Sequence, residues 1–164
     1  MSDSIKERAL VEAMERHKHR IYRLAYACLR RHADAEDILQ EVFIKYYRCA
    51  PEFENAEHEK AWLLRVTTNA CISLLRSPWR RLMSPIPDFM PAPAETGDSG
   101  WLISLVHRLP ARHAAVIHLH YYEDLSVKEI SSIQRIPEGT VKSRLARARS
   151  LLEDLIKKEE SIHG

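Results

Sequence analysis

The stretch LSVKEISSIQRIPEGTVKSRLARAR, residues 125–149, decides the fold of this 164-residue chain. Ser126 and Glu129 have the spacing of a capping box, in which each side chain accepts a hydrogen bond from a backbone N–H of the other residue. Leu125 and Ile130 are placed to form the hydrophobic staple that accompanies such a box. The pattern therefore predicts a short helix that starts directly after Ser126.

This short helix should cover about residues 127–134 and end at a break over 135–137. Beyond the break, Val141, Leu145 and Ala148 recur at three- and four-residue steps and mark the apolar face of a longer helix. A short capped helix, a tight turn and a longer basic helix form a helix-turn-helix. In that motif the second helix enters the major groove of DNA.

The opposite face of the longer helix is the predicted DNA-reading surface. Its small residues permit close approach to the groove, and Arg147 can form a two-pronged contact with a guanine edge. The cations beside it suit phosphates, which position a protein without reading sequence. The alternative is an ordinary solvated charged face. The predicted contacts are Gly139, Thr140, Lys142, Ser143, Arg144, Arg147 and Arg149.

The remainder of the chain also has helical periodicity, and no segment has the pattern of a strand. Apolar residues recur at helical steps over 10–29, and a second helix is predicted with Asp34 as its N-cap. Pro51 should end that helix. A third helix should run from near Glu57 to about Arg76, and the helical pattern resumes at about residue 101.

Five of the 8 prolines lie between residues 77 and 100, which predicts an extended, flexible linker because proline lacks the amide donor and clashes inside a helix. The predicted fold is therefore all-α, with two small helical domains joined by a Pro-rich linker. The expected bounds are 1–76, 77–100 and 101–164.

The composition excludes several classes of protein. Charge is nearly balanced, with 25 basic and 23 acidic residues, so nucleic-acid binding cannot be inferred from net charge. The start of the chain lacks an apolar secretory core, and no apolar run could span a membrane. The three cysteines have no paired spacing, and we expect reduced, packed thiols in a cytoplasmic protein. No motif indicates catalysis, a metal or a cofactor.

Segments in both halves of the chain resemble a known family. LSVKEI (125–130) and PEGTVKSRLARAR (137–149) resemble the region-four domain of bacterial sigma factors, closest to the extracytoplasmic-function (ECF) class. LPARH (109–113) and YYED (121–124) are similar to the segments that precede that helix-turn-helix. DAEDILQEVF (34–43) looks like the signature of region two, and WLLRVTTN, which ends at Asn69, is similar to the family's segment for the −10 promoter element.

The resemblance implies roles for the amino-terminal domain. In the family, the surface that corresponds to Asp37, Gln40 and Glu41 docks on the clamp helices of the largest polymerase subunit. An alternative is that the acids near the start of this helix only favour its N-terminus, which explains Asp34, Glu36 and Asp37 well but explains Gln40 and Glu41 poorly. The implied contacts with the −10 element, including capture of a flipped base by the loop, are Phe53, Asn55, His58, Lys60, Arg65 and Asn69.

Four features depart from the family pattern or are open. Thr67 stands where the family usually has alanine, and Ser73 where it often has aspartate. The loop over 51–59 is unusually acidic for a DNA neighbour. Trp62 fits core packing better than a DNA contact.

The resemblance implies a sigma factor that binds core RNA polymerase at the clamp helices and the flap. Region two would open the −10 element and region four would read the −35 element of promoter DNA. An anti-sigma factor, often membrane-bound in this class, is the expected regulator, as part of a stress response. The alternatives are a stand-alone helix-turn-helix regulator with an N-terminal partner-binding domain, and an adaptor that contacts only proteins.

Overall fold

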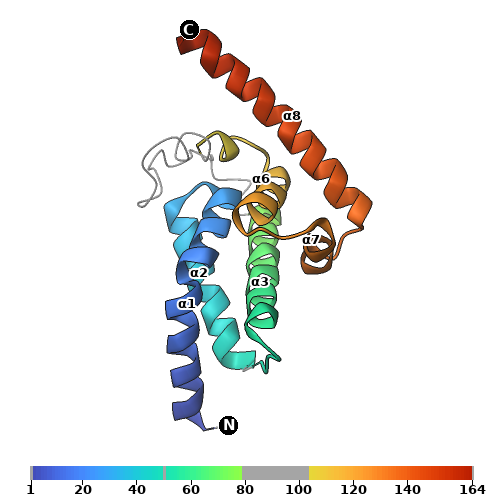
Figure 1. The fold of residues 1–164 in the computed structure, drawn as a ribbon. Helices are drawn as coiled ribbons and strands as arrows, with labels where there is room; N and C mark the ends of the chain where they lie inside the picture. The colour runs from blue at the N-terminus through green and yellow to red at the C-terminus, as the bar shows by residue number, and fades with distance from the viewer. Residues whose placement is uncertain (1, 50, 79–103, 164) are drawn as a thin grey trace. The chain divides into compact units, whose positions relative to one another are not determined.

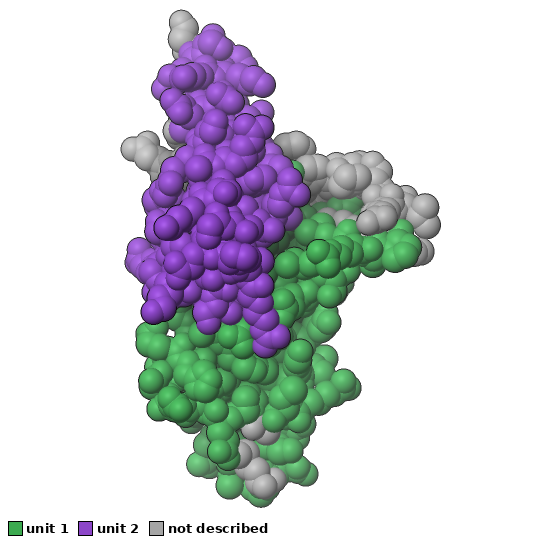
Figure 2. Space-filling view, turned by 90° about the vertical axis from the view of Figure 1, so that its right-hand side faces the viewer, with its two compact units in different colours: residues 1–87 green, residues 88–164 purple. Residues whose placement is uncertain are grey.

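The computed structural model describes residues 2–49, 51–78 and 104–163. These residues are helical almost throughout and include no strand, as predicted (Figure 1). The chain divides into two compact units, residues 1–87 and 88–164 (Figure 2). The predicted linker over 77–100 lies outside the described residues, except for its first two positions.

Unit 1 consists of α1 (Asp3–Leu29), α2 (His32–Cys49) and α3 (Ala56–Arg76), which pack against one another (Figure 1). The predicted apolar stripes supply the contacts between the helices. The largest fully buried side chains of this unit are Ile21, Leu24, Ile38, Val42, Leu63 and Leu64. The first helix begins well before the predicted position 10, because its first turns are polar and exposed and leave no apolar pattern to detect.

The turn between α1 and α2 corrects one prediction. Arg30 adopts a left-handed conformation (φ 60°), and its N–H donates to the Tyr26 carbonyl at 2.8 Å, which closes α1 tightly. The chain then re-enters a helix at His32. Asp34 is therefore in the first turn of α2 and is not its N-cap, although an acid there still favours the helix macrodipole.

Two of the three cysteines pack as predicted. Cys28 and Cys71 are buried between α1 and α3, whereas Cys49 is exposed at the last residue of α2. A hydrogen bond with Cys28, together with burial, holds the pKa of the Cys71 thiol well above its usual value. The Cys71 thiol is therefore a poor nucleophile, and both buried cysteines contribute as small core residues. The prediction of packing was wrong for Cys49.

Unit 2 contains α6 (Ala111–Ile117), the single-turn π-helix η1 (His118–Tyr122), α7 (Val127–Gln134) and α8 (Glu138–His163). The capping box is confirmed in both directions, and its two hydrogen bonds are each 3.1 Å long. Leu125 and Ile130 of the staple are both buried. Arg135, with φ 56°, ends α7 in a left-handed conformation, so the tight turn falls where the sequence predicted it.

Candidate nucleic-acid interface

The inner face of α8 fixes which of its side chains can reach a ligand. Val141, Leu145 and Ala148 are at most 2% exposed. The core under them includes Ile130 and Ile133 of α7, which packs against α8. Because an α-helix turns about 100° per residue, this burial directs the opposite face of α8 outward.

The outward face of α8 carries the predicted small residues. Gly139, Ser143 and Arg147 are exposed, and Thr140 is half-buried. A Cβ atom added at Gly139 would meet nothing within 4 Å, so the backbone is open to solvent there. The Ser143 hydroxyl donates to the Gly139 carbonyl at 3.0 Å, which turns it back onto its own helix.

The cations at this face do not share one environment. Lys142 is exposed, whereas burial and the nearby Arg112 lower the pKa of the half-buried Arg144. Burial, followed by Arg112, Arg144 and Arg147, also lowers the pKa of His113, which keeps this imidazole neutral among three arginines. Arg112 comes from α6, so a second element adds positive charge beside the recognition helix.

Arg149, a predicted contact on α8, is held by a specific side chain. Its Nε atom donates to the Tyr121 hydroxyl at 2.6 Å, and its guanidinium lies 5.5 Å from the centre of the same ring. Tyr121 belongs to η1, and the π-helix places it on the surface with 55% of its area exposed. The two residues together form an exposed cation–aromatic pair.

A second exposed face runs along α3 in unit 1. Asn69 is exposed, and Arg65, one turn earlier, is half-buried. The Arg65 Nε atom is buried, and it has no hydrogen-bond partner in the described part of the chain. Helix geometry places His58 and Trp62 on the same side, but places Lys60 about 140° away from Arg65. Five of the six predicted contacts thus share a face or the adjoining loop, and Lys60 does not.

The loop before α3 is held by its own side chains. Asn55 is the N-cap of α3 and accepts from the His58 N–H at 2.9 Å. The His58 Nδ1 atom accepts in turn from the Glu54 N–H at 3.2 Å. The loop therefore ends at residue 55, earlier than the predicted 59, because Asn55 starts the helix.

Phe53 lies in an aromatic cluster with Tyr46, His58 and Trp62. Its ring centre is 6.1 Å from that of Tyr46, 5.9 Å from that of Trp62 and 5.3 Å from that of His58. Edge-to-face and offset pairs at such separations are favourable beyond the apolar area that they bury. The packing expected for Trp62 is therefore observed, and Phe53 shares it.

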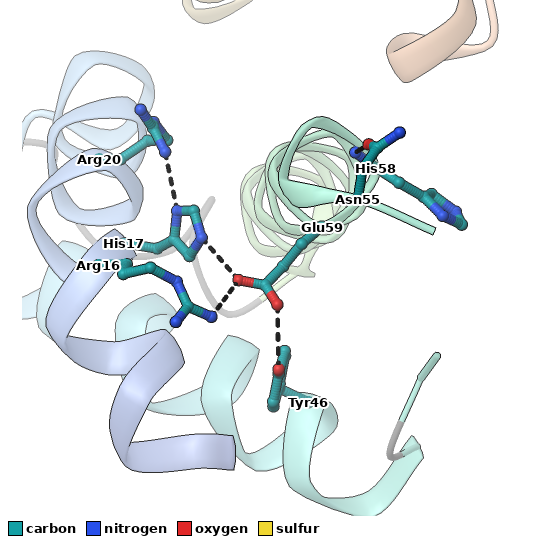
Figure 3. A network of polar contacts seen from close by, with 7 residues as sticks. All are labelled: Arg16, His17, Arg20, Tyr46, Asn55, His58 and Glu59. Atoms are coloured by element: carbon teal, nitrogen blue, oxygen red, sulfur yellow. Dashed lines mark hydrogen bonds and ion pairs between the residues drawn. The ribbon is translucent and has the colours of Figure 1, made fainter. Parts of the chain in front are cut away.

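Behind this cluster lies a buried polar network centred on Glu59 (Figure 3). Its Oε1 atom accepts from Arg16 and His17, each at 2.8 Å, and its Oε2 atom accepts from the Tyr46 hydroxyl at 3.3 Å. The hydrogen bonds from Arg16 and His17 overcome burial and lower the pKa of Glu59. Glu59 thus points inward, so it does not add to the acidity of the loop before α3 as the sequence suggested.

The substitution at Thr67 also has a structural account. Thr67 and Thr68 are buried, and their hydroxyls donate to the carbonyls of Leu63 and Leu64 at 2.7 and 2.8 Å. A buried hydroxyl bonded within its own helix avoids the cost of an unsatisfied polar group. The Ser73 departure lies at an exposed position of α3.

The predicted polymerase-binding residues lie together on α2. Asp37, Gln40 and Glu41 are all exposed, at the i, i+3 and i+4 spacing that gives one edge. The helix begins at His32 and Asp34 is the acid of its first turn, so all three residues lie beyond that turn. The helix macrodipole acts mainly within the first turn and therefore does not account for them.

Sequence reasoning missed Arg112, Tyr121 and the Glu59 network. Each depends on contacts between residues far apart in sequence, for which a single periodic segment gives no signal. In the described part of the chain, no group of three or more His, Cys, Asp or Glu side chains is arranged to hold a metal ion. None of the described helices is long and apolar enough to cross a membrane.

Comparisons with known proteins agree with this arrangement of two helical units. The model of sigma-70 region 2 matches residues 13–81, and that of sigma-70 region 4 matches residues 99–152. Among solved structures, a sigma factor RpoE from Bartonella quintana, crystallised with the anti-sigma factor NepR, has a TM-score of 0.75. It is 24% identical, and the match covers 89% of this chain and 95% of that one. CnrH, solved with the cytosolic domain of CnrY, has a TM-score of 0.65 at 20% identity, with 93% and 90% coverage. These two likenesses show the fold.

Curated relatives extend the match to named proteins. ECF sigma factor SigE of Mycolicibacterium smegmatis is 33% identical over 92% of this chain, and this chain spans 62% of its length. SigM of Mycobacterium tuberculosis is 30% identical, covering 90% of this chain and 77% of that protein. SigW of Bacillus subtilis is also 30% identical, with 88% and 87% covered. The fold and the two matched regions define a two-domain sigma factor of bacterial RNA polymerase. The chain belongs to the ECF sigma factor family.

Proposed function

We propose that this chain binds core RNA polymerase and directs promoter-specific initiation of transcription. Unit 2 reads the −35 element in duplex DNA through α8, and unit 1 opens the −10 element and holds it at α3 and the loop before it. The observation that carries this proposal is the open face of α8. Small residues and Arg147 lie opposite a fully apolar inner face, which is the arrangement that a recognition helix needs.

The −10 assignment is supported by the exposed face of α3. A buried donor without an acceptor is costly, and the Arg65 Nε atom is such a donor in the described residues. A phosphate of single-stranded DNA would satisfy it. Asn69, one turn further on, would then reach the same strand. In unit 2, the exposed pair of Tyr121 and Arg149 supports phosphate binding because it presents a cation at the surface.

The polymerase assignment is supported by the exposed edge of Asp37, Gln40 and Glu41. Acids that face a basic partner speed encounter and fix register more than they raise affinity. Two DNA-reading units on one chain also make promoter binding bivalent, so that each raises the effective concentration of the other. The segment over 77–100 is proposed as the linker between them, and the flap of the polymerase as a further contact of unit 2.

An anti-sigma factor is the proposed regulator, because both solved neighbours are complexes, one of them with an anti-sigma factor by its description. It would cover the surfaces that bind polymerase and DNA. Attachment of that partner to a membrane is part of this proposal. The sigma factor itself would act in the cytoplasm without catalysing a reaction.

Co-elution with bacterial core RNA polymerase on a sizing column tests the proposal. We expect a stable one-to-one complex, and promoter-dependent transcripts when the complex is given genomic fragments in a run-off assay. Failure of the folded, inhibitor-free protein to co-elute would overturn the proposal. Tight binding to a palindromic operator without polymerase would instead establish a stand-alone regulator.

A further inference from the structure

The Glu59 network joins all three helices of unit 1 at one carboxylate. Arg16 and His17 come from α1, Tyr46 comes from α2, and Glu59 itself is in the first turns of α3. Its side chain is only 11% exposed, whereas that of Arg16 is 52% exposed. Figure 3 shows Arg16 and His17 reaching one carboxylate oxygen while Tyr46 reaches the other.

The hydrogen bonds fix the protonation state of His17. Arg20 lies 2.8 Å from the His17 Nδ1 atom, and a guanidinium can only donate. Nδ1 must therefore carry its lone pair, so the proton is on Nε2 and is donated to Glu59. In this arrangement His17 is neutral and Glu59 is ionised. Burial is the main reason that the pKa of His17 lies below its usual value.

Protonation of His17 would disturb this arrangement. A proton on Nδ1 would face the Arg20 guanidinium and remove that hydrogen bond. The cluster would then hold three cations, Arg16, His17 and Arg20, around one carboxylate. The other groups that face it are the neutral Tyr46, whose pKa burial and Glu59 raise to about 12, and Glu12, which faces Arg16 and Tyr46.

Tyr46 carries the effect from the network to the loop. Its hydroxyl donates to Glu59, and its ring is paired with Phe53 of the loop and with Trp62 of α3, at 6.1 and 5.9 Å between ring centres. Movement of the carboxylate therefore acts on the side chain against which the loop packs. Phe53 also packs against Trp62 and His58, so Tyr46 is one of three rings that face it.

We propose that Glu59 and neutral His17 are positioning residues that hold the loop over residues 51–55 in the conformation that opens the −10 element, and that acid releases this hold. The inference rests on the proposed function, because it assigns the loop to promoter opening. Glu59 and His17 lie outside the predicted DNA contacts, and pH acts on the opening step through them.

The test measures promoter opening as a function of pH. Core polymerase with the full chain is placed on a promoter fragment recovered by the run-off assay, and permanganate reactivity of −10 thymines is followed from pH 5.8 to 8.0. For the wild type we expect opening, relative to its value at pH 8.0, to fall as the pH falls towards the lowered pKa of His17.

Two variants separate positioning from folding and from the polymerase's own response to pH. His17→Phe combined with Glu59→Leu replaces the buried pair with apolar groups, a change that is often tolerated. Its normalised profile should show only the polymerase's own response to pH and should lack the acid drop. His19→Asn combined with Glu15→Gln changes an exposed histidine and an exposed acid on α1, and should retain the wild-type profile.

Coincident normalised profiles for the wild type and the His17→Phe, Glu59→Leu variant would overturn the inference while leaving the proposed function intact. Absence of opening by the wild type at every pH would instead overturn the proposed function, and the inference with it. Retention of the acid drop in the exposed-residue variant and its loss in the buried-residue variant is the supporting result.

Discussion

The helices α3 and α8 both face DNA in the proposed function, but they are held in opposite ways. The inner face of α8 is apolar at Val141, Leu145 and Ala148. The inner face of α3 includes Glu59, whose carboxylate is bonded to both other helices of unit 1. Apolar packing tolerates small adjustments, whereas a buried charge needs every partner in place. At these positions α8 thus packs through apolar contacts, whereas α3 adds a buried carboxylate to its own apolar contacts at Leu63 and Leu64.

The largest expected effect comes from removing that carboxylate alone. Glu59→Leu leaves Arg16, His17 and the Tyr46 hydroxyl without their shared acceptor. We expect the free energy of unfolding to fall by about 3 kcal/mol. Urea titration of the full chain, followed by circular dichroism, measures this. A fall in the free energy of unfolding of less than about 1 kcal/mol would show that the buried carboxylate under α3 does not set it apart from α8.

Next in size is the effect of Arg147→Ala in unit 2. Loss of a two-pronged guanine contact should cost about 1–3 kcal/mol at one −35 base pair and relax specificity there. Competition between promoter fragments with single-base changes measures it, with Lys142→Ala as the matched control. The lysine variant should weaken binding to all sequences alike. Uniform weakening by Arg147→Ala would show that this arginine contacts phosphate only.

A smaller effect is expected at the acidic edge of α2. Asp37→Lys combined with Glu41→Lys should weaken polymerase binding about tenfold without changing the fold, because the new cations would face a basic partner. Titration of labelled polymerase gives the affinity. Glu7→Lys combined with Glu15→Lys makes the same charge change at exposed positions of α1 and should not weaken binding. Equal affinities for both variants would contradict the docking assignment.

The smallest effect is the pH dependence of the stability of unit 1. Burial lowers the pKa of His17 in the folded chain, so its stabilising contribution is present above about pH 6.5 and is lost as the pH falls towards the folded-state pKa. We expect the free energy of unfolding to fall by up to about 1 kcal/mol between pH 7.5 and 6.0. Urea titrations at both values test this. If the His17→Phe, Glu59→Leu variant shows the same difference in free energy of unfolding between the two pH values, the effect does not arise from His17.

Sequence predicted α7 and α8 better than it predicted the turn before α2. The capping box and the staple use residues within five positions of one another, so their geometry is local and the bounds of α7 were correct. Arg30 ends α1 in a left-handed conformation. Glycine or asparagine usually indicates such a helix end in a sequence, and neither is present here. With Asp34 predicted as the N-cap, the start of α2 was therefore placed three residues late.

The candidate site was predictable where exposure follows from periodicity. Burial of Val141, Leu145 and Ala148 necessarily turns Gly139 and Arg147 outward. Glu59 shows the limit of that reasoning, because it was grouped with the acids of an exposed loop. Its burial depends on a histidine 42 residues earlier, and periodicity within α3 carries no information about that partner.

The pair formed by Tyr121 and Arg149 has a consequence for the entropy of binding. A free arginine side chain loses about 2 kcal/mol of rotamer freedom when it is immobilised. Here the hydrogen bond to Tyr121 and the stacked ring already restrict Arg149 before any ligand arrives. Most of that ordering occurs on folding. A phosphate that binds Arg149 therefore interacts with the positive charge without the full entropic cost of immobilising the arginine side chain.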